Sequence, residues 1–135
     1  MTLILDSSAL LAIALNEPAA DVVLNRMQNT SDGVLIHAVN ATEVAYKLML
    51  KGVPEDAAWE ATSFGGLQRI SDVSDVITHA VARLKTTSPF LSLADCFCLA
   101  LGEYLEADVI TSDGRFQRAT TLAKVFIFRQ QERLK

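Results

Sequence analysis

The chain has 135 residues, of which 50% are hydrophobic and 21% are charged, with six glycines and three prolines. This composition favours one compact globular domain over 1–135 and excludes a disordered chain. Only two cysteines are present and no apolar run approaches the roughly 20 residues of a membrane span, so we expect a cytoplasmic protein held together by its core rather than by disulfides.

Short apolar runs alternate with helical patterns along the whole chain. The expected strands are 2–5, 34–37, 67–70, 108–111 and 124–128. The expected helices are 8–15, 18–28, 40–51, 54–63, 73–85, one that begins after Ser92, and a short one at 115–122. Consecutive parallel strands need a crossover, which helices supply. We therefore predict an α/β fold in which helices cover both faces of a central, mainly parallel sheet.

Acidic residues recur where these elements begin. Asp6 directly follows the first strand, and Asp113 follows the strand at 108–111. Glu43 falls in the first turn of the expected helix 40–51, a few residues after another strand. Open parallel sheets bind ligands outside the carboxyl ends of their strands. We expect these three acids to share that edge of the sheet.

Asp95 is the only charged residue in the stretch 93–101. A helix that is apolar almost all round is buried, so we expect this carboxylate to lie in the core. An ionised carboxylate left alone there costs several kcal/mol, as an order of magnitude, unless it is paired, protonated or bound to a cation. Asp95 therefore needs a partner.

Each acid also has a structural explanation. Residues 92–95 and 40–43 both have capping-box spacing, Asp6 and Asp113 are placed to cap the following helices, and Glu43 can pair with a lysine one turn later. A cluster is harder to explain, because two carboxylates about 5 Å apart repel by roughly 3 kcal/mol at an effective dielectric of 20. Mg²⁺ or Mn²⁺ would offset that repulsion with the hard oxygen ligands that both ions prefer.

The net charge of −4 counts against a nucleic-acid partner, but gathering four acids into one metal site would leave the remainder about neutral. Basic residues bias the C-terminal end toward positive charge, which leaves RNA binding open. They are Arg115, Arg118, Lys124, Arg129, Arg133 and Lys135.

Four segments in this order resemble the PIN domain family, and within it the VapC-type toxins of type II toxin–antitoxin pairs. They are Leu-Asp-Ser-Ser at 5–8, Asn-Ala-Thr-Glu-Val at 40–44, Leu-Ala-Asp-Cys at 93–96 and Thr-Ser-Asp-Gly-Arg-Phe at 111–116. The resemblance covers nearly the whole chain. It implies a PIN-like three-layer α/β/α fold and a metal-dependent endoribonuclease.

The resemblance also assigns roles to residues. The family's acidic quartet carries over onto Asp6, Glu43, Asp95 and Asp113, and its Thr-x-Asp-x-x-Phe element includes Thr111. Asp6 and Asp95 would be the primary ligands of Mg²⁺ or Mn²⁺, and the other two acids would complete the pocket. Thr111 would orient a carboxylate or the attacking water.

Partners follow from the same resemblance. It implies an RNA substrate, whose backbone Arg115 and Arg118 are candidates to hold, a homodimer, and a cognate antitoxin that blocks the acids. Two alternatives remain open. One is a non-catalytic PIN scaffold that binds protein or RNA. The other is an aspartyl-phosphate phosphotransfer enzyme, against which Ser8 stands where such phosphatases have a second Asp.

Overall fold

The structure is a computed structural model that describes residues 2–129. Within that range, five parallel strands form one sheet in the order β3-β2-β1-β4-β5. The strands are β1 (Leu3–Leu5), β2 (Val34–His37), β3 (Leu67–Ile70), β4 (Asp108–Thr111) and β5 (Lys124–Ile127). Each lies within a residue or two of its expected position.

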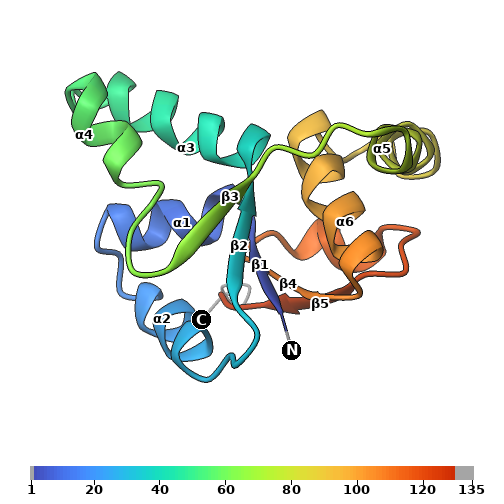
Figure 1. Ribbon diagram of the computed structural model, residues 1–135, viewed down its shortest axis with the longest axis horizontal. Coiled ribbons are helices and arrows are strands. Elements are labelled where there is room, and N and C mark those ends of the chain that lie inside the picture. Colours follow the sequence, from blue (N-terminus) through green and yellow to red (C-terminus); the bar gives the residue numbers. More distant parts are fainter. Residues whose placement is uncertain (1, 130–135) are drawn as a thin grey trace, which may run out of the picture.

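Helices cover both faces of the sheet, which confirms the predicted three-layer α/β/α architecture. In Figure 1, α1 to α4 lie on one side of the strands, and α5 and α6 lie on the other. The helices are α1 (Ser7–Ala14), α2 (Ala20–Gln28), α3 (Ala38–Leu50), α4 (Glu55–Glu60), α5 (Asp75–Thr87) and α6 (Leu93–Leu105), with a 3₁₀ helix η1 (Gly114–Arg118) before β5. Among the described residues, none of these helices has the length and apolar character needed to cross a membrane.

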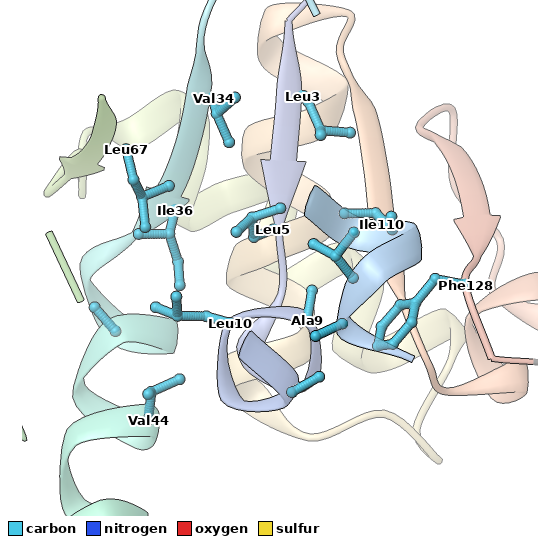
Figure 2. Close-up of a cluster of buried hydrophobic side chains, with 14 of the residues drawn as sticks. Leu3, Leu5, Ala9, Leu10, Val34, Ile36, Val44, Leu67, Ile110 and Phe128 are labelled. Carbon is cyan, nitrogen blue, oxygen red and sulfur yellow. The ribbon is translucent and has the colours of Figure 1, made fainter. Parts of the chain in front are cut away.

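The central strand β1 is apolar throughout because both of its faces are covered. Leu3 and Leu5 point into one core. Figure 2 shows this core, to which Leu10 of α1 and Val44 of α3 also belong. Ile4 points the opposite way, into the second core beneath α5 and α6. The alternation of side chains along one short strand therefore ties the two helical layers together.

The order of connections places a crevice beside β1. From β1 the chain builds outward to β2 and then β3, and it returns through α5 and α6 to place β4 on the other side of β1. Leu5 of β1 pairs with Ile110 of β4, so the carboxyl ends of these two strands are neighbours. Such a switch point is where open parallel sheets bind ligands.

Helix α6 packs closely on β4 through Gly102. A Cβ added at this glycine would lie 2.7 Å from Cγ2 of Val109 and 3.2 Å from Cβ of Ala123. Only a glycine lets the helix approach the strand this closely. This contact fixes α6, and with it Asp95, relative to the sheet.

Several predicted helix ends differ from the structure by two or three residues, such as that of α4, which ends at Glu60 rather than at residue 63. Two further differences concern α3 and η1. Helix α3 begins at Ala38 rather than at residue 40, because His37 caps it by accepting a hydrogen bond at Nδ1 from the backbone N–H of Val39 (3.1 Å). The capping box predicted over 40–43 is therefore wrong, and Glu43 lies in the second turn. The predicted helix 115–122 is the shorter 3₁₀ helix η1.

The cysteines behave as expected, since Cys96 and Cys98 are both buried and free. Two of the basic residues noted at the C-terminal end, Arg133 and Lys135, lie outside the described residues, as do positions 1 and 130–135 of the expected domain.

Candidate functional site

Asp6 is the most deeply buried of the four acids, with 3% of its surface exposed. It caps α1 by accepting hydrogen bonds at Oδ1 from the backbone N–H of Ala9 (3.0 Å) and from Oγ of Ser8 (2.7 Å). Burial nevertheless raises the pKa of Asp6 to about 6, outweighing these bonds, and the charge of Asp95 adds to the rise. Burial thus destabilises the ionised form of this carboxylate, and a bound cation would stabilise it.

Thr111 supports Asp6 from the neighbouring strand. Its hydroxyl donates to Oδ2 of Asp6 (2.5 Å) and accepts from the backbone N–H of Asp113 (3.0 Å). Ser8 makes a second connection, because its Oγ accepts from the backbone N–H of Ser112 (2.9 Å). The ends of β1 and β4 are therefore joined by side-chain hydrogen bonds directly behind the acids.

Asp95 lies in the first turn of α6 and forms a capping box with Ser92. The backbone N–H of Ser92 donates to Oδ2 of Asp95 (2.9 Å), and the backbone N–H of Asp95 donates to Oγ of Ser92 (3.1 Å). Burial raises the pKa of Asp95, and the charges of Asp113 and Glu43 add to the rise. These charges act on Asp95 only because the three acids are close.

The expectation that Asp95 lies in the core is wrong. It is half-buried, and the buried part of α6 is formed by Cys96 and residues 98–102. The helix is apolar because it packs between α5 and the sheet, whereas its first turn reaches the sheet edge. The fully buried carboxylate is that of Asp6.

Glu43 and Asp113 are each paired with a cation. Nζ of Lys47 lies 3.1 Å from Oε2 of Glu43, the predicted pairing across one helical turn, and Ser7 donates to Oε1 of Glu43 (2.5 Å). Nη2 of Arg115 donates to Oδ2 of Asp113 (2.7 Å), and these hydrogen bonds lower the pKa of that carboxyl. Asp113 also caps η1, as the structural explanation required.

All four acids line one cavity of about 440 Å³ at the switch point. The cations Lys47 and Arg115 line it as well. The remaining lining residues are Ser7, Ser8, Leu11, Ser92 and Ser112. The cavity wall is thus made of carboxylate and hydroxyl oxygens with two counter-cations.

Thr111 and Arg118, the other residues expected at the site, are not part of the cavity wall. Thr111 is fully buried behind Asp6. The guanidinium of Arg118 lies over the ring of Phe90, 5.1 Å from its centroid. Arg115 reaches the same residue differently, donating from Nη1 to the carbonyl of Phe90 (3.1 Å).

The oxygen-rich wall fits a hard divalent cation better than zinc. Within residues 2–129, no group of three or more His, Cys, Asp or Glu side chains is arranged to hold a metal directly. Mg²⁺ does not require such a group, because it keeps several waters and binds proteins through one or two carboxylates. Asp6 and Asp95 both line the cavity and would supply the two carboxylates.

Sequence reasoning included Thr111 but missed the other residues that hold the acids in place. Ser7 and Ser8 follow Asp6 directly and bond to Glu43 and to Asp6, respectively. Two hydroxyls beside a candidate ligand were the available signal. Asn40 is also fully buried near this network, and its only signal was its position three residues before Glu43.

An all-parallel sheet with carboxylates gathered at its switch point defines an α/β protein with an acidic site at the strand ends. The model of the PIN domain family matches residues 3–122, so the chain belongs to the PIN domain family. No curated protein matches the chain in sequence.

Solved structures share the fold at low sequence identity. A chain of VapBC2 from Rickettsia felis, bound to a promoter DNA fragment, has a TM-score of 0.76 at 15% identity, covering 94% of this chain and 98% of that one. VapBC-1 from nontypeable Haemophilus influenzae gives 0.70 at 16%, covering 95% and 98%. Mycobacterium tuberculosis VapC20, described as a sarcin-ricin loop cleaving toxin, gives 0.69 at 15%, covering 89% and 96%.

Proposed function

We propose that the protein is a metal-dependent endoribonuclease and the toxin of a type II toxin–antitoxin pair. The observation that carries this proposal is the cavity where Asp6, Glu43, Asp95 and Asp113 meet, with one of these carboxylates fully buried and its pKa raised to about 6. Membership of the PIN domain family supports it. The fold shared with VapC20, a toxin that cleaves the sarcin-ricin loop, supports RNA as the substrate class.

Asp6 and Asp95 are the residues we propose as primary ligands of Mg²⁺ or Mn²⁺, with Glu43 and Asp113 completing the pocket. When bound, the ion would lower the pKa of a water and stabilise negative charge on the phosphoryl oxygens. Thr111 holds Oδ2 of Asp6 through its hydroxyl, which fixes the orientation of that carboxylate. Two of the four acids would thus carry the ion, and the hydrogen bonds around them fix the directions of their carboxylates.

Lys47 and Arg115 are the two cations of the cavity wall, and we propose that they contact the RNA backbone. Each pairs with an acid of the cavity, and each has a side chain that is two-fifths or more exposed. An exposed guanidinium on the wall of an acidic cavity offsets the repulsion that phosphates would otherwise meet there. We propose Arg115 as a phosphate contact, with Arg118 beside it on the same 3₁₀ helix.

A cognate antitoxin and a second copy of the chain are the proposed protein partners, in the cytoplasm. The neighbours from Rickettsia felis and Haemophilus influenzae are VapBC structures, and one from Klebsiella pneumoniae is described as a toxin–antitoxin complex. Helix α3 carries exposed apolar side chains, among them Tyr46 and Leu50, the latter 80% exposed. Such side chains are typical of surfaces that bind another protein.

The test is cleavage of a mixed tRNA and rRNA pool by the purified protein with Mn²⁺ or Mg²⁺, with EDTA, and with Asp95→Asn alongside. We expect cleavage that requires the ion and is lost in the variant. Absence of cleavage, together with no Mn²⁺ or Mg²⁺ binding by calorimetry, would overturn the proposal and favour a non-catalytic PIN scaffold.

A further inference from the structure

Asn40 has a buried side-chain amide that does not reach the surface of the acidic cavity. It lies in the first turn of α3, where only 1% of its surface is exposed, and it is not part of the cavity wall. Asn is seldom fully buried, and an amide without hydrogen bonds in a core costs about 1–3 kcal/mol. A specific set of partners must therefore account for its position.

The Asn40 side chain joins the two elements that carry Asp6 and Asp95. Its Nδ2 donates to the carbonyl of Ala94 (3.2 Å), which directly precedes Asp95 in α6. The same Nδ2 donates to Oγ of Ser7 (3.3 Å), which directly follows Asp6 in α1. One amide group thus spans the first turns of two helices that come from different parts of the chain.

Ser7 extends this connection to a third acid. Its hydroxyl lies 2.5 Å from Oε1 of Glu43 and 3.3 Å from the backbone carbonyl of Asn40. Glu43 is on the same helix as Asn40, one turn further along. The first turns of α1, α3 and α6 are therefore held together by a single amide and a single hydroxyl, and each of these helices carries one of the acids.

Stability alone does not explain this arrangement. Within residues 2–129, Oδ1 of Asn40 is buried without a hydrogen-bond partner. An unsatisfied acceptor of this kind is a cost that a well-packed apolar side chain would avoid. The two hydrogen bonds donated by Nδ2 of Asn40 instead fix the relative positions of the segments that carry Asp6, Asp95 and Glu43.

We propose that Asn40 is a positioning residue of the acidic site, acting through Ser7 and Ala94 to hold these carboxylates at the spacing a divalent cation requires. This inference rests on the proposed function. Hydrogen-bonding residues behind metal ligands change metal affinity by about 10- to 100-fold when they are lost. Asn40 would act in this way without touching the ion or the RNA.

The test is Mn²⁺ binding to the full chain, measured by titration calorimetry together with the urea unfolding midpoint. For Asn40→Ala we expect a dissociation constant raised by about tenfold or more. The matched control is Thr62→Ala, which removes the side-chain hydrogen bonds of another fully buried residue. The Thr62 hydroxyl donates to the carbonyl of Trp59 (2.7 Å) and accepts from Nη1 of Arg69 (3.0 Å). None of these three residues lines the acidic cavity, so the control should lower stability and leave Mn²⁺ affinity within about twofold.

A double-mutant cycle with Ser7→Ala separates positioning from general loss of stability. If both residues act through one network, the dissociation constant of the double variant for Mn²⁺ should be about that of the weaker-binding single variant. If they act independently, it should be raised by the product of the two single effects. If Asn40→Ala does not fold, Asn40→Ser, which keeps a hydroxyl donor, and Ser7→Ala carry the same comparison. Unchanged Mn²⁺ affinity in the folded Asn40 variants would overturn the inference while leaving the proposed function intact. A wild-type protein that binds no Mn²⁺ and cleaves no RNA would overturn both.

Discussion

Asp6→Asn should stabilise the metal-free protein at neutral pH. The pKa of Asp6 is raised from 3.8 to about 6 in the folded state, so at pH 7 the folded chain holds an ionised carboxylate that burial disfavours. A shift of about two pKa units corresponds to about 3 kcal/mol, which the neutral amide would recover in part or in full. The gain appears as a higher free energy of unfolding.

The pH dependence identifies ionisation as the cause. Because the folded state holds its proton more tightly than the unfolded state, the contribution of Asp6 to stability is present below pH 3.8 and is lost as the pH rises to about 6. The gain from Asp6→Asn should therefore be largest at pH 7 and fall toward zero near pH 3.8. Urea unfolding in EDTA at both pH values measures it. A variant that is less stable at pH 7, or equally stabilised at both values, would refute this reasoning.

Three further substitutions test the packing, the support of the buried acid and the proposed phosphate contact. Gly102→Ala should lower the free energy of unfolding by about 1–3 kcal/mol in a thermal melt, because its methyl group collides with β4. Thr111→Val should cost about 1–3 kcal/mol and raise the pKa of Asp6 further, since the buried carboxylate loses a donor; urea unfolding across pH 4–8 reports both. Arg115→Ala should raise the pKa of Asp113 and weaken RNA binding, with a salt-dependence slope shallower by about one, as measured by filter binding over a range of salt concentrations.

Each of these has a control or a contrary outcome. Gly114→Ala matches the glycine change where an added Cβ meets no atom within 4 Å, and it should leave stability nearly unchanged. An equal loss in both glycine variants would remove the packing argument. A Thr111→Val protein with the wild-type pH profile would show that the threonine hydroxyl does not support Asp6. An unchanged salt slope in Arg115→Ala would make its guanidinium only a partner of Asp113.

Much of the fold was predictable because it depends on local patterns. Local sequence patterns indicate the apolar strand at 3–5 and the Ser92 capping box, and the structure contains both. The start of α3 was not predictable, because a histidine ring rather than Ser, Thr, Asp or Asn caps it. Because α3 begins two residues earlier than predicted, Glu43 lies in its second turn rather than in its first.

The sequence indicated which acids gather at the sheet edge, and the family resemblance indicated Thr111 beside them, but neither indicated the supporting roles of Ser7, Ser8 and Asn40. Topology brings the strand ends together, so Asp6 and Asp113 were foreseeable neighbours in any parallel sheet with this order. The hydrogen bonds from Thr111 to Asp6 and from Asn40 to Ala94 join residues 105 and 54 positions apart, and no local pattern encodes them. The exposure of Asp95 did not follow from the apolar character of its helix, because the capping position places this carboxylate at the sheet edge.

The most direct test of the acidic site is a crystal of the protein soaked in Mn²⁺, with the ion located by its anomalous scattering. We expect a peak in the cavity between Asp6 and Asp95, at a coordination distance of about 2.1 Å from a carboxylate oxygen of each. The same peak should be absent in Asp6→Asn. Two results would contradict the assignment of these acids as a metal site. One is an ion bound only elsewhere on the protein, and the other is a cavity without Mn²⁺ at millimolar concentration in a crystal whose surface shows clear Mn²⁺ peaks.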